Sequence, residues 1–107
     1  MKKVIIGFRF VNSNVILKDH ENHIRLAVKA ASRNLFYRFG IQITCIEFDE
    51  ETNQCIIYLL TDSEDEERYN WPRKLRGISA YLLKQWPDVY KPLRHGTRLF
   101  YYWHCSN

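Results

Sequence analysis

The chain has 107 residues, of which 46% are hydrophobic and 15% aromatic, with four Gly, three Pro and a formal net charge of +4. This length predicts a single domain over residues 1–107, with enough buried surface to fold without metals or disulfides. The many aromatic residues and the few Gly and Pro exclude a disordered linker and a collagen-like chain.

The apolar runs of the chain are short. The first, Val4-Ile5-Ile6-Gly7-Phe8, is broken by Arg9, and the second covers only residues 56–60. A signal peptide needs roughly 7–15 apolar residues and a membrane span about 20, so neither run predicts one. We therefore expect a cytoplasmic protein that does not bind membranes. Three cysteines without zinc-like spacing fit a reducing compartment and are predicted to lie in the core: Cys45, Cys55 and Cys105.

The net charge conceals three blocks of opposite sign. Residues 1–40 hold eight bases and two acids (+6), residues 41–67 hold nine acids and no base (−9), and residues 68–107 hold eight bases and one acid (+7). Such asymmetry bears on partners and association and not on the fold. A polyanion would have to avoid the acidic block, whereas a basic partner or another copy could use it.

The first half of the chain predicts a strand, a helix and a hairpin. Apolar alternation predicts a strand over Lys3–Val11, and a three- and four-residue apolar spacing predicts a helix from an Asp19 N-cap to Phe39, with Gly40 as its C-cap. Strands over Ile41–Phe48 and Gln54–Thr61 are joined by the polar residues 49–53. The buried stripe of the helix is expected to contain Ile24, Ala27, Val28, Ala31, Leu35 and Phe39.

The second half predicts a helical region and a last strand. Ser63 and Glu66 form a capping box for a helix that ends or kinks near Trp71, because Pro72 cannot continue the hydrogen-bond ladder. Pro72 then begins a second segment, and Pro87 ends it. The aromatic stretch Thr97–Cys105 is the last predicted strand. Core-facing residues of the second segment are expected to be Leu75, Ile78, Ser79, Leu82, Leu83 and Trp86.

The predicted element order is β-α-β-β-α-β. This order favours an α+β, ferredoxin-like two-layer sandwich, with a four-stranded antiparallel sheet and two helices on one face. The alternative makes residues 15–17 a strand that pairs with the first strand across the turn at 12–14.

Side-chain alternation assigns each strand residue to one face of this sheet. The uniformly apolar sets are predicted to face the helices: Val4, Ile6, Phe8, Phe10, Ile41, Ile43, Cys45, Cys55, Ile57, Leu59, Leu99, Tyr101, Trp103 and Cys105. The other face is then too apolar for ordinary surface, which indicates an interaction site. Its members are expected to be Ile5, Gly7, Arg9, Gln42, Thr44, Ile46, Phe48, Gln54, Ile56, Tyr58, Leu60, Arg98, Phe100, Tyr102 and His104.

Two kinds of partner suit this second face. The aliphatic residues favour a protein, either a second copy or a regulatory partner, because aliphatic side chains do not stack on bases. The alternative is RNA or single-stranded nucleic acid, with bases stacked on aromatic rings and phosphates bound by cations. The residues expected to bind either partner are Arg9, Phe48, Tyr58, Arg98, Phe100, Tyr102 and His104.

Two basic rows on the predicted helices suit phosphate contacts. They are Arg25, Lys29 and Arg33 on the first helix, and Arg73, Lys74 and Arg76 on the second. The first row places like charges four residues apart, and the second places cations at the positive end of a helix. The alternative interpretation is that these cations form a solvated surface or pair with the acidic block at residues 41–67.

No catalytic motif is found, and we expect a binding protein without enzymatic activity. His20 and His23 have the spacing of one helical turn, but zinc needs three or four converging ligands, so no metal site and no cofactor are predicted. A nucleophile would need a Cys or Ser beside a His and an orienting acid. The absence of a Gly-rich phosphate loop also argues against acylphosphatase chemistry.

Overall fold

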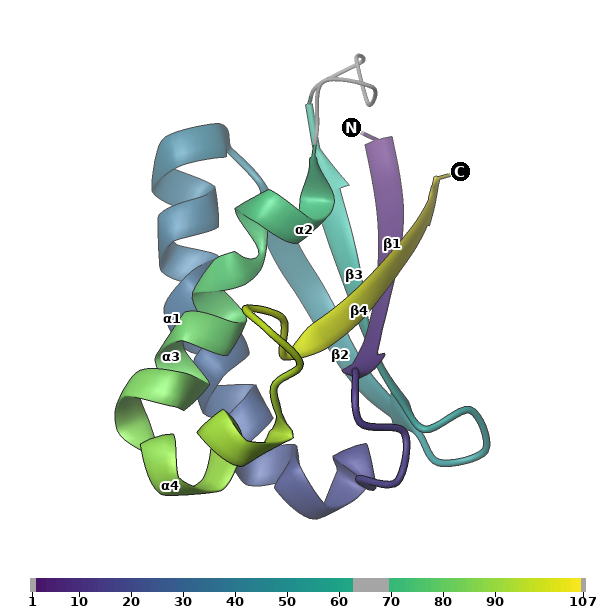
Figure 1. The fold of residues 1–107 in the computed structure, drawn as a ribbon. Helices are drawn as coiled ribbons and strands as arrows, with labels where there is room; N and C mark the ends of the chain where they lie inside the picture. Colours follow the sequence, from purple (N-terminus) through teal and green to yellow (C-terminus); the bar gives the residue numbers. More distant parts are fainter. Residues whose placement is uncertain (1, 63–69, 107) are drawn as a thin grey trace.

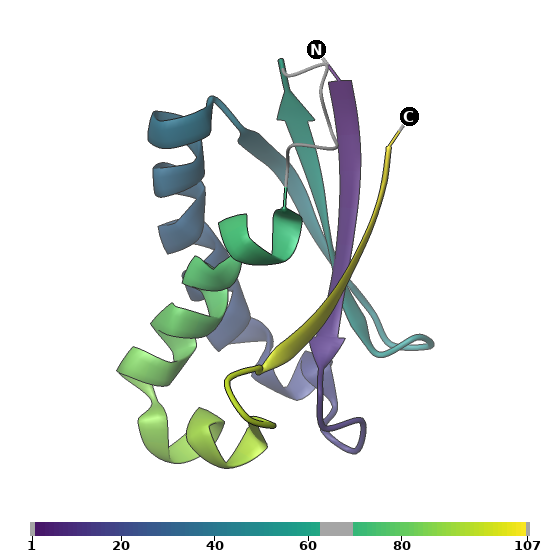
Figure 2. The ribbon, with the colours of Figure 1, turned by 45° about the horizontal axis from the view of Figure 1, so that its top comes forward.

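The computed structural model describes residues 2–62 and 70–106, which form a four-stranded antiparallel sheet with a layer of helices on one face (Figure 1). The strands are β1 (Lys2–Phe10), β2 (Gln42–Asp49), β3 (Gln54–Thr61) and β4 (Phe100–Ser106). The helices are α1 (Glu21–Phe39), α2 (Trp71–Lys74), α3 (Arg76–Gln85) and α4 (Pro87–Tyr90), with 3-10 turns at Leu17–His20 and Lys91–Leu93. The predicted α+β class with an antiparallel sheet is confirmed, and Figure 2 shows the two layers from a second side.

The strand order across the sheet is β2-β3-β1-β4. β1 is central because it pairs antiparallel with both β3 and β4, and β2 pairs with β3 at one edge. The alternative prediction of a strand at residues 15–17 is wrong. Leu17 instead begins a 3-10 turn and is buried in the core.

Helix α1 ends where it was predicted to end but starts later. The 3-10 turn Leu17–His20 precedes it, so Asp19 is not its N-cap, and the helix begins at Glu21. Gly40 ends it in the left-handed conformation, with φ of 66°, as predicted, and its N–H bonds to carbonyls of the last turn. The apolar stripe is buried as expected, except that Phe39 is only half-buried.

The helical region after β3 is divided into short pieces. The predicted capping box of Ser63 and Glu66 lies outside the described residues. Asn70 caps α2, its Oδ1 accepting the Arg73 N–H at 3.4 Å, and Pro72 lies in the first turn as predicted. The chain then breaks at Leu75 before α3, and Pro87, which was predicted to end the helical segment, begins the further short helix α4.

The face assignment for β2 is correct only in its first half. Ile41 and Ile43 face the helices, but the β2–β3 register shifts between Ile43 and Cys45. The extra residue of a bulge reverses the alternation after it. Cys45 is therefore exposed, and Ile46 and Phe48 pack against the core, contrary to the prediction.

The face assignment for β4 is reversed along the strand. Phe100 pairs with Phe10 and Tyr102 with Phe8, whose side chains face the helices. Tyr101 and Trp103 consequently lie on the other face. Phe100 is only 4% exposed and contacts the Phe8 ring, with the two centroids 4.8 Å apart.

Candidate functional site

The helices of residues 2–62 and 70–106 all lie on one side of the sheet, and the opposite side is the open face. On β1 and β3 it contains the predicted residues, since these strands alternate without a bulge. Ile5, Ile56, Tyr58 and Leu60 are half-buried there, whereas Arg9 is exposed. The centre of the open face is therefore apolar, with charge toward its margins.

Strand β4 adds an aromatic pair, Tyr101 and Trp103, to the open face. These rings are 44% and 41% exposed, high values for side chains of this size. The guanidinium of Arg9 lies 5.1 Å from the Tyr101 ring centroid. The Trp103 indole extends from β4 over Gly7 of β1, and its N–H donates to Oε1 of Gln54 on β3. The aromatic pair thus covers one half of the open face.

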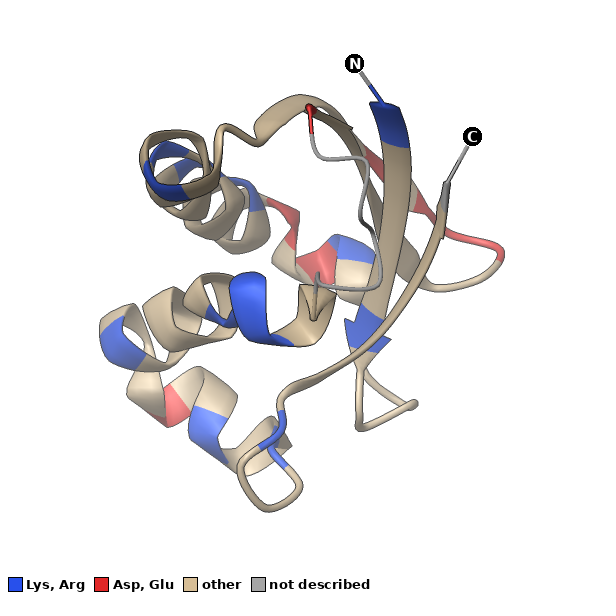
Figure 3. Ribbon diagram, turned by 90° about the horizontal axis from the view of Figure 1, so that it is seen from above, with Lys and Arg blue, Asp and Glu red and all other residues tan. Residues whose placement is uncertain are grey.

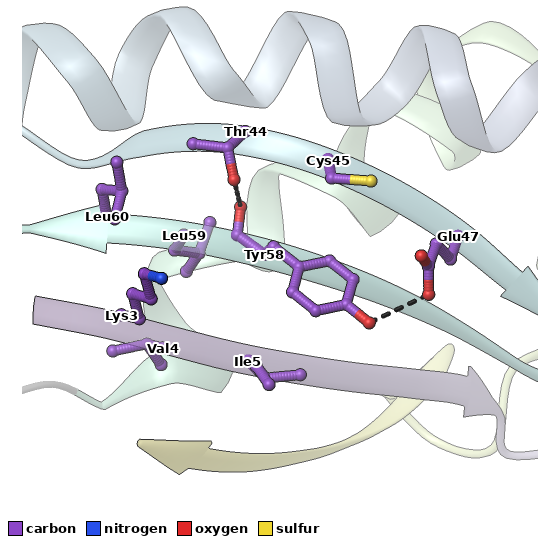
Figure 4. A pocket seen from close by; sticks show the side chains of 9 residues that line it. All are labelled: Lys3, Val4, Ile5, Thr44, Cys45, Glu47, Tyr58, Leu59 and Leu60. Carbon is purple, nitrogen blue, oxygen red and sulfur yellow. Dashed lines mark hydrogen bonds between the residues drawn. The ribbon is translucent and has the colours of Figure 1, made fainter. Parts of the chain in front are cut away.

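The other half of the open face contains a shallow hollow of about 520 Å³ between β1, β3 and β2 (Figure 4). The Tyr58 hydroxyl donates to Oε2 of Glu47 at 2.9 Å, and this bond raises the pKa of Tyr58. The Thr44 hydroxyl donates to the Tyr58 carbonyl at 3.2 Å. Figure 4 labels the residues that line the hollow: Lys3, Val4, Ile5, Thr44, Cys45, Glu47, Tyr58, Leu59 and Leu60.

Of the seven residues predicted to bind a partner, only Arg9 and Tyr58 lie on the open face. Arg98 is exposed, but it lies in the tight turn before β4, where it bonds with His95. His104 is exposed as well, but it pairs with Ile6 and so belongs to the helix-side register. The remaining three residues point inward.

Each of these three inward rings has a structural contact. Phe48 packs against the core and has the Arg25 guanidinium 5.1 Å from its centroid. Tyr102 donates its hydroxyl to the Leu75 carbonyl at 3.4 Å, and burial raises its pKa. Phe100 contacts Phe8. The open-face residues that sequence reasoning missed are Tyr101, Trp103, Glu47, Cys45 and Cys105. Gly7 on the strand beside β4 was a local signal for Trp103.

The cysteines differ in burial. Cys55 is buried as predicted, and desolvation raises its pKa to about 12. Cys45 and Cys105 are exposed, which corrects the prediction that all three fill the core. Both belong to the open face, because Cys45 pairs with Tyr58 and Cys105 pairs with Ile5, and Tyr58 and Ile5 lie on that face.

A cluster of His20, His23 and Tyr90 lies at the start of α1, against α4. The Tyr90 hydroxyl is 3.0 Å from Nδ1 of His20 and 2.7 Å from Nδ1 of His23. It can donate to one neutral imidazole and accept the N–H of the other. The His23 ring also stacks on Trp86 at 3.6 Å. Both histidines are thus engaged by protein groups, and within residues 2–62 and 70–106 no three His, Cys, Asp or Glu side chains converge as metal ligands.

The two predicted basic rows are separated in space. Arg73, Lys74 and Arg76 line a groove of about 690 Å³ beside the C-terminal half of α1. Arg25, Lys29 and Arg33 do not line it. Arg25 instead donates to Oε2 of Glu21 at 2.8 Å, and the bonds of Glu21 with Lys18 and Arg25 lower its pKa.

The comparisons with known proteins return no family model, no curated protein and no solved structure that matches the chain. Among the helices of the described part of the chain, none has the length and apolar character needed to cross a bilayer.

Proposed function

We propose that the chain is a self-associating binding module, in which the open face packs on the open face of a second copy. The observation that carries this proposal is the exposed aromatic pair beside half-buried Ile5, Ile56 and Leu60. Tyr, Trp and Arg are enriched at protein interfaces. Two sheets that pack face to face interdigitate apolar side chains across roughly 10 Å.

The two halves of the open face are complementary to each other. One half presents the exposed rings of Tyr101 and Trp103 with the Arg9 cation, and the other contains the hollow with the Glu47 carboxylate. A two-fold axis parallel to the strands would bring β4 of one copy opposite β2 of the other. Because such an axis keeps each residue at its level along the strands, Trp103 then lies opposite Glu47 at the edge of the hollow, and Arg9 approaches Glu47 of the second copy. Such an isologous contact closes after two copies.

Single-stranded nucleic acid on the same face has weaker support. Phe48, Phe100 and Tyr102, three of the rings expected to stack on bases, point inward. The Glu47 carboxylate on the open face would repel phosphates. We therefore favour a protein partner for this face.

We also infer that the fold is a ferredoxin-like βαββαβ sandwich. Support comes from the strand order, with β1 between β3 and β4, and from the helices of the described residues, which lie on one face of the sheet. Such a fold implies no activity by itself, and our proposal includes none. The exposed thiols of Cys45 and Cys105 suit a reducing compartment, and we propose the cytoplasm.

The experiment is light scattering coupled to size exclusion, from low to high micromolar concentration. The full chain is expected to become dimeric within this range. Tyr101→Glu should be monomeric, because it places a carboxylate within the contact. Tyr37→Glu is the matched control, since Tyr37 lies on α1 and is 84% exposed. A monomeric wild type throughout, or equal behaviour of the two variants, would refute the proposal.

A charge exchange tests the orientation of the two copies. Arg9→Glu should abolish association, because it faces Glu47 of the second copy with a like charge. Combining it with Glu47→Arg should restore dimers, because Glu at position 9 of one copy then attracts Arg at position 47 of the other. Failure of the double variant to associate, while it unfolds at the wild-type temperature, would exclude this two-fold arrangement.

A further inference from the structure

A basic groove lies in the helical layer, away from the open face. It separates the C-terminal half of α1 from the α2–α3 segment, and its volume is about 690 Å³. Four cations line it: Arg38 from α1, Arg73 and Lys74 from α2, and Arg76 from α3. Figure 3 shows Lys and Arg on the end of α1 and on the α2 turn across from it. The fold therefore brings together charges that are about 35 residues apart in sequence.

The described residues that line the groove carry positive charge. Among the described residues that line it, none is Asp or Glu. Arg76 is the first residue of α3, where the helix dipole disfavours a cation, whereas Arg73 and Lys74 end the short helix α2. A bound anion would reduce the mutual repulsion of Arg38, Arg73 and Arg76. The geometry thus favours a negatively charged ligand.

The remaining groove lining favours phosphate oxygens over flat rings. The amide of Asn34 and the hydroxyl of Thr97 provide hydrogen-bond donors at its margin. The aromatic ring in the groove, Phe39, is already engaged by cations. Lys74 Nζ lies 3.4 Å from its centroid, and the Arg38 guanidinium lies 5.5 Å away. Nucleobases therefore have no vacant ring to stack on, whereas phosphates meet several donors.

We propose that the basic groove binds the phosphodiester backbone of a single-stranded nucleic acid without reading its bases. Four cations from three helices can contact several successive phosphates of a polymer, whereas a mononucleotide would contact only some of these cations. A groove of this kind, which follows a backbone, is typical of binders without sequence preference. The groove and the open face lie in different layers, so this proposal does not depend on the self-association proposed above.

The experiment is fluorescence polarisation with labelled single strands of about twelve nucleotides, as RNA and as DNA. The full chain should bind mixed-sequence, oligo-U and oligo-A strands with similar affinity. Between about 50 mM and 200 mM salt, log K should fall with log salt with a slope of about −2 to −3, as expected for three or four phosphate contacts. No binding at the lower salt concentration, or strong preference for one base, would overturn the proposal.

Two double variants, each lacking two positive charges, locate the binding surface. Arg38→Gln with Arg73→Gln should weaken binding about tenfold at low salt and reduce the magnitude of the slope by about 1.4. Lys29→Gln with Arg33→Gln removes the same net charge from exposed α1 residues that do not line the groove, and should change affinity much less. Arg76→Gln provides a third variant if the first pair fails to fold. Equal losses in the groove and control variants would refute a site in this groove.

Discussion

The indole of Trp103 occupies the space above Gly7 into which any other residue would project its side chain. A Cβ at Gly7 would overlap three atoms of this ring. The two residues are direct partners in the β1–β4 register. Glycine at the centre of β1 thus allows a large ring from the edge strand to lie across the sheet and reach Gln54 on β3.

Substitution of Gly7 tests this contact. Gly7→Ala should displace the Trp103 ring and lower the free energy of unfolding by about 1–3 kcal/mol, as overpacking does. The measurement is urea unfolding followed by tryptophan fluorescence. Gly77→Ala is the control. Gly77 lies in α3, and a Cβ there would lie 3.7 Å from the Ala31 Cβ, which is an ordinary van der Waals contact. The control should be neutral or stabilising by about 0.5–1 kcal/mol. A Gly7→Ala protein as stable as wild type would contradict the contact.

The reversed faces of β4 predict opposite effects at neighbouring positions. Phe100→Ala should lower the free energy of unfolding by about 3–5 kcal/mol, because it removes a buried ring that packs on Phe8 and Phe10. Tyr101→Ala should cost about 1 kcal/mol or less, since its ring is 44% exposed on the open face and contacts the Arg9 guanidinium there. Chemical denaturation of the two variants provides the comparison. A larger cost at Tyr101 would mean that the strand has the opposite register.

Asn53 connects the β2–β3 turn to the segment after β1. Its Nδ2 donates to the Val15 carbonyl at 2.9 Å, and its Oδ1 accepts the Leu17 N–H at 2.8 Å. Its φ is 53°, in the left-handed region. Asn53→Ala should cost about 2–4 kcal/mol, from two lost hydrogen bonds and from backbone strain.

Asn53→Gly separates these two contributions. Glycine loses the same two hydrogen bonds but adopts the left-handed conformation without strain. It should therefore be more stable than Asn53→Ala by about 1–2 kcal/mol. Thermal and urea unfolding of both proteins measure the difference. Equal stability would show that the backbone conformation contributes nothing.

The His20 cluster predicts a loss of stability in mild acid. Burial lowers the pKa of His20, and so does the neighbouring His23, while Asp19 acts weakly in the opposite direction. The unfolded chain therefore binds a proton at His20 more readily than the folded chain does. The contribution of His20 to the free energy of unfolding is fully present above pH 6.5, the ordinary pKa of histidine. It decreases as the pH falls through and below this value.

Urea unfolding at pH 7.5 and 5.5 measures this dependence. The decrease in the free energy of unfolding between these values should be smaller in His20→Gln than in wild type, because glutamine does not titrate. Glu21 does not account for the difference, since its pKa is lowered from 4.5 and it titrates below this window. Identical pH dependence in the two proteins would exclude His20 as its source.

Much of the fold could be predicted from local patterns. β1 and β3 alternate without interruption, α1 carries one apolar stripe that ends at Gly40, and Pro72 marks the beginning of a helix. In each case one side of the element is clearly more apolar than the other. Burial of that side is favourable in any packing, so the pattern needs no knowledge of its neighbours.

Tertiary structure alone decided the faces of β4 and of the second half of β2. Both alternations of Leu99–Trp103 are apolar or aromatic, so hydrophobicity does not select a face. Pairing with β1 selects it, since a shift of one residue would exchange Phe100 and Tyr102 for Tyr101 and Trp103. In β2 the bulge after Ile43 reverses the alternation.

The amino-acid sequence therefore determined by itself the order of the elements, the alternation of β1 and β3 and the charge of each segment. It could not determine which aromatic rings remain exposed, or that Arg38 lies beside Arg73 and Arg76. Those features depend on strand register and helix packing, which are relations between segments that no local pattern contains. Both proposed binding surfaces are built from such relations.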